Sequence, residues 1–118
     1  MSSWSKHTKA NTNGIGDYEL KKEDYIKPAD MLAKYGEDVK ILGGYINGKS
    51  KMGAHPVIFV ETKDGVKGLD LNQSYTEQWK AIFADPDDRE TIESGKASGK
   101  LVKCFSDTYK KEFVAFQI

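Results

Sequence analysis

The sequence is poor in the residues that cross-link small domains or hold metals. It contains one cysteine, Cys104, and two histidines, His7 and His55. A single cysteine excludes an internal disulfide, and these three side chains do not have the spacing of a metal site. The chain also lacks an apolar run resembling a signal peptide or long enough to cross a bilayer. We therefore expect no metal, no membrane association and an intracellular, reducing location, the cytoplasm.

The chain has no excess of either charge, because 18 basic side chains balance 18 acidic ones. This excludes a histone-like mode of binding that relies on bulk positive charge. The charges are nevertheless unevenly placed: residues 85–93 hold five acids and one arginine, whereas residues 48–53 and 109–111 hold four lysines and no acid. A local basic surface fits this distribution, and so do ordinary solvated loops.

Motifs for catalysis are missing as well. Neither a phosphate-binding loop nor a dinucleotide fingerprint occurs, and the glycines at 14 and 16 lie in a polar segment. A nucleophilic pair of Cys104 and His55 is disfavoured, because strand alternation points Cys104 inward. The acids at 85, 87 and 88 fit the first turn of a helix better than a calcium loop. We expect a protein that is not an enzyme and needs no cofactor.

Alternating apolar residues from residue 38 onward predict strands. The predicted strands are 39–46, 56–62, 66–71, 101–105 and 113–118. A double glycine, Gly43 and Gly44, lies inside the first of them and favours a β-bulge, which a small barrel needs in order to close.

A helix is predicted between the third and fourth strands. Its apolar stripe consists of Tyr75, Trp79, Ile82 and Phe83, and Pro86 ends or kinks it. Three strands, a helix and two strands is the element order of the OB-fold. We therefore predict an all-β domain with a helix over residues 38–118, a five-stranded antiparallel OB-fold barrel.

The residues before this domain are expected to contribute little to it. Residues 1–17 are rich in Ser, Thr, Asn, Lys and Gly and predict a flexible N-terminal arm that is dispensable for folding. Residues 18–37 predict a short helical lead-in, in which Pro28 opens a helix and Gly36 ends it.

Binding of single-stranded nucleic acid requires aromatic faces for the bases and cations for the phosphates. Outward positions of the predicted sheet and lysines of its loops supply both kinds of side chain. Tyr45 joins them if the bulge turns it outward, and Phe113 is a further candidate; each aromatic taken alone is also compatible with a place in the core. The predicted nucleic-acid-binding residues are Tyr45, Lys49, Lys51, Phe59, Lys67, Lys103, Phe105, Tyr109, Lys110 and Lys111.

Four segments resemble the single-stranded DNA-binding proteins of lactococcal phages. They are residues 41–47 (ILGGYIN), 53–57 (GAHPV), 90–96 (ETIESGK) and 109–113 (YKKEF), and the resemblance extends over residues 38–118. It implies an OB-fold viral protein that binds single-stranded DNA without sequence preference in phage DNA replication or recombination, in the host cytoplasm. It also implies a homo-oligomer and replication or recombination proteins as possible partners. The acidic tail of bacterial relatives is not found, so recruitment through such a tail is not expected.

Self-association as a homodimer is predicted from the last strand, whose Phe113 gives an apolar edge that pairing would cover. Two other classes of function stay open. One is an OB-like module that binds another protein and no nucleic acid. The other is a small enzyme or ligand-binding protein on a different scaffold. Salt dependence distinguishes the first from a DNA-binding protein, because nucleic-acid binding weakens steeply as salt rises.

Overall fold

The computed structural model describes residues 11–16, 18, 20–48 and 53–118. Its elements are β1 (Asn11–Ile15), the 3-10 turn η1 (Lys22–Asp24), β2 (Tyr25–Ile26), α2 (Pro28–Tyr35), β3 (Asp38–Asn47), β4 (His55–Thr62), β5 (Gly65–Asp70), the 3-10 turn η2 (Gln73–Tyr75), α3 (Thr76–Ala84), α4 (Pro86–Glu93), β6 (Ser98–Ser106) and β7 (Lys111–Gln117).

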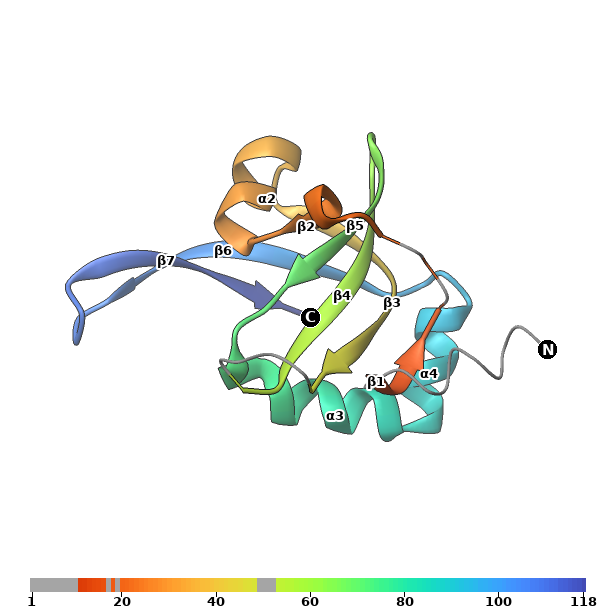
Figure 1. Ribbon diagram of the computed structural model, residues 1–118. Coiled ribbons are helices and arrows are strands. Elements are labelled where there is room, and N and C mark those ends of the chain that lie inside the picture. Colours follow the sequence, from red (N-terminus) through yellow and green to blue (C-terminus); the bar gives the residue numbers. More distant parts are fainter. Residues whose placement is uncertain (1–10, 17, 19, 49–52) are drawn as a thin grey trace.

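The strands form one sheet that curls into a half-barrel (Figure 1). Its order is β2-β5-β4-β3-β6-β7, and β1 pairs with β3 beside β6. The prediction of a mostly β, barrel-like domain is confirmed, and so is the helix between the third and fourth predicted strands. The sheet differs from the prediction in two ways: it has two further strands, β1 and β2, and the β2–β5 pair is parallel.

Strand β1 comes from the predicted flexible arm, which is therefore wrong for residues 11–15. The strand pairs antiparallel with the end of β3, and the side chain of Ile15 is only 3% exposed. The pairing is close: a Cβ atom on Gly43 would lie 2.1 Å from the Ile15 carbonyl oxygen. The register of β3 against β4 shifts between Ile41 and Gly43, which confirms the predicted bulge. Residues 1–10 and 17 lie outside the described residues.

Helices α3 and α4 cover one end of the half-barrel (Figure 1). Trp79 and Phe83 of α3 are each 1% exposed, and the Trp79 ring stacks on Phe116 of β7 with the centroids 6.1 Å apart. Asn72 caps the preceding turn by accepting a hydrogen bond from the Ser74 amide at 2.9 Å. As predicted, α3 ends just before Pro86, which begins α4.

Helix α2 packs between β5 and β7, where the curled sheet is not closed by strand pairing. It contacts both β5 and β7, and its Met31 is 1% exposed within the core. At its end the Tyr35 hydroxyl donates a hydrogen bond of 2.7 Å to Asp64 in the β4–β5 turn. This hydrogen bond lowers the pKa of the Asp64 carboxyl below its ordinary value. The half-barrel is therefore closed on this side by helix packing.

None of the helices in the described segments has the length and apolar character needed to cross a membrane.

Candidate nucleic-acid interface

The outer part of the β6–β7 hairpin, residues 102–114, projects from the body as a two-stranded ribbon (Figure 1). It projects because β3 pairs with β6 only as far as the Asp38–Lys100 pair, so that beyond this point β6 has β7 as its partner. Large apolar side chains on the ribbon face solvent: Phe105 is 59% exposed, Tyr109 is 74% exposed and Phe113 is 46% exposed. Exposed aromatic rings gathered in one region are typical of interaction surfaces.

Lysines accompany these rings. Lys103 is exposed two residues before Phe105, and Lys110 and Lys111 follow Tyr109 at the turn. Within the segments that the structure describes, none of the three lysines makes an ion pair. The turn is held by the Tyr109 amide, which donates a hydrogen bond of 3.2 Å to the Ser106 hydroxyl. The ribbon therefore presents rings for stacking beside uncompensated cations.

The two faces of the ribbon carry different side chains. Residues opposite each other in a ladder share a face, and the pairs Lys103–Val114 and Phe105–Glu112 lie on one face. Phe113 is opposite Cys104 and lies on the other. Phe113 therefore does not extend the surface of Phe105. The prediction that Cys104 points inward is wrong, because its half-buried thiol lies on the same face as Phe113.

A second aromatic group lies on the outer face of the body. Phe59 in β4 alternates outward as predicted, but it is only 5% exposed because the rings of Tyr18 and Tyr45 cover it, with centroids at 5.2 and 5.6 Å. Phe59 is therefore not available for stacking. The Tyr45 hydroxyl lies 3.4 Å from that of Tyr25, and burial together with this contact raises the pKa of Tyr45 well above its ordinary value. Tyr18 and Tyr25 are the exposed members of the group, at 40% and 41%.

Charged side chains surround this group, but they pair with one another. Lys67 Nζ lies 3.1 Å from Asp24, a contact that raises the pKa of the lysine. The pKa of Asp24 is lowered by the Lys21 backbone N–H and then by Lys67. Lys27 and His55 both approach Asp70 at 2.9 Å, and the histidine forms an ion pair when it is protonated. The predicted site residue Lys67 is therefore compensated in charge and is a poor phosphate ligand.

The predicted site residues do not form one surface. Lys40 pairs with both Glu61 of β4 and Ser98 of β6, which places Phe59 on the same face of the sheet as the even-numbered residues of β6. Phe105 is odd-numbered and lies on the opposite face. Tyr45 and Phe59 therefore belong to the body, whereas the ribbon carries Lys103, Phe105, Tyr109, Lys110 and Lys111. Lys49 and Lys51 lie outside the described residues.

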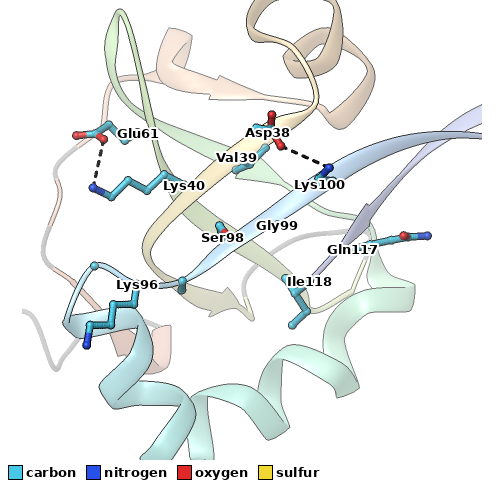
Figure 2. Close-up of a pocket in the computed structure, with 12 residues that line it drawn as sticks. Asp38, Val39, Lys40, Glu61, Lys96, Ser98, Gly99, Lys100, Gln117 and Ile118 are labelled. Atoms are coloured by element: carbon cyan, nitrogen blue, oxygen red, sulfur yellow. Dashed lines mark ion pairs between the residues drawn. The ribbon is translucent and has the colours of Figure 1, made fainter.

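A groove of about 680 Å³ lies at the base of the ribbon, between the starts of β3 and β6 (Figure 2). Lys40, Lys96 and Lys100 line it. Figure 2 shows two of these lysines paired with acids: Lys40 with Glu61 at 3.6 Å and Lys100 with Asp38 at 3.9 Å. With most of its charge compensated, the groove is a weaker anion site than the turn of the ribbon.

Sequence patterns did not place Tyr18, Tyr25 or Lys27 in the aromatic and charged group around Phe59, and they considered His55 only as a metal ligand or as a partner of Cys104. Tyr18, Tyr25 and Lys27 lie in a stretch dominated by charge. The apolar residues Leu20, Tyr25 and Ile26 within it are the signal that could have identified this stretch. The described residues contain no group of three or more His, Cys, Asp or Glu side chains able to hold a metal ion.

No family model matches the chain, and no curated protein or solved structure matches it either.

Proposed function

We propose that this protein binds single-stranded DNA without sequence preference and that the β6–β7 ribbon is its main contact surface. The observation that carries the proposal is the exposure of Phe105 and Tyr109 beside three lysines that make no ion pair within the described residues. Bases of any sequence stack on aromatic rings, and lysines follow the phosphates. The proposed role is in phage DNA replication or recombination, as the resemblance to the lactococcal phage proteins implies.

The proposed scaffold is an OB-type barrel formed by β3, β4, β5, β6 and β7. The ladders β3–β4, β4–β5, β3–β6 and β6–β7, with α3 and α4 between β5 and β6, support this assignment. In such barrels the loops between strands 1–2 and 4–5 bind oligonucleotides. The turn of the ribbon is the second of these loops. The first is residues 48–54, which include Lys49 and Lys51.

The net neutrality of the chain fits a local contact better than a long electrostatic track. The ribbon holds Lys103, Lys110 and Lys111 against Asp107 and Glu112, an excess of one positive charge. Stacking rather than charge is therefore expected to supply most of the free energy. We expect affinity to depend on ring removal more than on salt, although it still falls as salt rises.

The test is fluorescence anisotropy with labelled oligo-dT and with duplex DNA, each at low and moderate salt. The native chain should bind oligo-dT more tightly than the duplex, whose bases are already stacked. Phe105→Ala and Tyr109→Ala should each weaken oligo-dT binding roughly ten- to hundred-fold, because stacking contributes about 1–3 kcal/mol per base.

The matched control is Phe113→Ala, which removes a similarly exposed ring from the other face of the same ribbon. It should retain most of the affinity for oligo-dT. Equal affinity for single and double strands, or no binding to oligo-dT at low salt, contradicts the proposal. The exposed ribbon would then be assigned to the alternative function, binding of another protein.

A further inference from the structure

One edge of the ribbon is left open by the way β3 ends. The Ile41 amide donates to the Ala97 carbonyl at 3.0 Å, and the Leu101 amide donates to the Glu37 carbonyl at 2.8 Å. Odd-numbered residues of β6 therefore direct their backbone groups toward β3. Lys103 and Phe105 continue this row past the end of β3. In the part of the chain that the structure describes, their outward N–H and C=O groups have no partner.

The opposite edge of the ribbon, along β7, is protected at its inner end. The even-numbered residues of β7 direct their backbone groups outward there, and the Phe116 amide donates a hydrogen bond of 3.0 Å to the Tyr75 hydroxyl. Helix α2 also packs against β7. A strand that paired along this edge would meet both Tyr75 and α2. The β7 edge is therefore covered at its inner end by Tyr75 and α2, as the β6 edge is covered at its inner end by β3.

We propose that two copies of this chain associate by antiparallel pairing of their β6 edges around a two-fold axis at Cys104. In this register Lys103 of each copy is opposite Phe105 of the other, and each such pair exchanges two backbone hydrogen bonds. The two Cys104 residues face each other at the axis. This interface goes beyond the proposed DNA binding, although its cross-strand contacts use Lys103 and Phe105, which the DNA-binding proposal also uses. Either proposal can fail without the other, because self-association tests this one and oligo-dT binding tests the other. It also replaces the β7 edge as the site of the predicted homodimer.

A second copy fits this edge because the edge complements itself. Lys103 would lie across from an exposed phenylalanine ring, an arrangement that attracts an ammonium group. The ribbon turn of each copy, with Lys110 and Lys111, would lie beside the start of β3 in the other copy, where Glu37 and Asp38 are exposed. Opposite charges therefore meet at both ends of the paired strands.

The paired segment is short, since Lys103 and Phe105 are the residues that supply the outward backbone groups. An interface of this size belongs to the small class typical of weak or transient complexes. We expect a dimer that forms at tens of micromolar and dissociates on dilution. Light scattering or sedimentation over a concentration series of the full chain should show this transition.

Cys104 provides a specific test, because it is the only cysteine in the chain. Opposed residues that do not share hydrogen bonds have Cα atoms about 4.5 Å apart, within the ~4.4–6.8 Å range of disulfides. A mild oxidant added to the native chain should give a disulfide-linked dimer much faster than in urea. Cys104→Ser should still dimerise reversibly, since the disulfide only reports the contact. Cross-linking that is no faster in the folded chain than in urea overturns the proposal.

A matched pair of proline variants separates the two edges. Lys103→Pro removes an outward N–H from the β6 edge, and Glu112→Pro removes one from the β7 edge of the same ribbon. Lys103→Pro should abolish the dimer, and Glu112→Pro should leave it. Circular dichroism checks folding, and the cross-linking of the native chain stands alone if either variant is unfolded. A chain that is monomeric at all concentrations, or that loses its dimer only with Glu112→Pro, contradicts the proposal.

Discussion

The body and the ribbon both contain aromatic residues, but these side chains are buried in the body and exposed on the ribbon. In the body, Phe116 of β7 is only 4% exposed and its ring stacks on Trp79 of α3. On the ribbon, Phe105 and Tyr109 are 59% and 74% exposed. Both regions use alternating strands, so alternation alone does not bury a ring. What differs is the second layer: helices α2, α3 and α4 cover the body, and no element of the described chain covers the ribbon. Aromatic rings of the body therefore stabilise the fold, and those of the ribbon are free to bind.

Removal of a ring from each region tests this contrast most directly. Trp79→Ala should lower the free energy of unfolding by about 3–5 kcal/mol, because it deletes a large buried ring and leaves a cavity. Phe105→Ala should change it by less than about 0.5 kcal/mol, as expected for an exposed side chain. Urea denaturation followed by circular dichroism measures both values. Similar losses for the two variants would show that the ribbon is part of the core.

The body should also be sensitive to the strand that sequence patterns missed. In Gly43→Ala the new methyl group would lie 2.1 Å from the Ile15 carbonyl oxygen, so β1 must move away from β3. We expect a loss of about 1–3 kcal/mol, the usual cost of overpacking. Gly65→Ala is a poor control because the φ of Gly65 is positive, whereas Ala33→Gly on an exposed part of α2 reports a backbone change without a clash.

A truncation that begins at residue 17 should destabilise the fold as well, and an unchanged thermal transition would contradict a structural role for β1.

Charge on the ribbon is expected to have a smaller effect than its rings. Lys110→Ala and Lys111→Ala should each weaken oligo-dT binding modestly and make the salt dependence shallower by about 0.7 in log–log slope, because one fewer counterion is released. Lys67→Ala is the matched control in the body, where the lysine is paired with Asp24. Its salt slope should equal that of the native chain. Equal changes for all three lysines would show that the body takes part in binding.

The smallest effect is expected in the body, at the hydrogen bond between Tyr35 and Asp64. This bond lowers the pKa of Asp64 in the folded state, so its stabilisation is present above the unfolded pKa of about 3.9 and is lost as pH falls through the lower folded value. Tyr35→Phe should therefore be less stable than the native chain at neutral pH by a small, constant amount. The difference should vanish in acid. Thermal unfolding from neutral pH to about pH 2.5 checks this, and a pH-independent difference would assign the effect to packing.

Much of the body could be predicted because its strands and α3 each bury one face, and one-sided burial makes apolar residues recur at a regular spacing. The apolar stripe through Trp79 and Phe83 and the alternation around Ile58 both show this spacing. Strand β1 shows no such spacing of apolar residues. Its residues Asn11, Thr12 and Asn13 are polar, and its pairing depends on backbone groups that every sequence possesses.

The candidate site was predicted less well because it depends on contacts between distant residues. Alternation placed Phe59 outward correctly, but one of the two rings that cover it belongs to Tyr18, 41 positions earlier in the chain. The separation of Phe59 and Phe105 onto different faces follows from the register of β3 against both β4 and β6. A pattern read within one strand holds no information on that register. The exposure of Lys110 and Lys111 was predicted correctly, because connections between strands run over the surface.

The position of helix α2 between β5 and β7 has a consequence for biosynthesis. It packs against β7, so a helix near residue 30 gains part of its contacts only when a strand near residue 115 is in place. Contacts this distant in sequence form late in folding, and β7 leaves the ribosome well after α2. Until then α2, whose Met31 is 1% exposed in the folded chain, lacks its contacts with β7. Between the synthesis of α2 and that of β7, the nascent chain is therefore expected to leave this apolar contact uncovered.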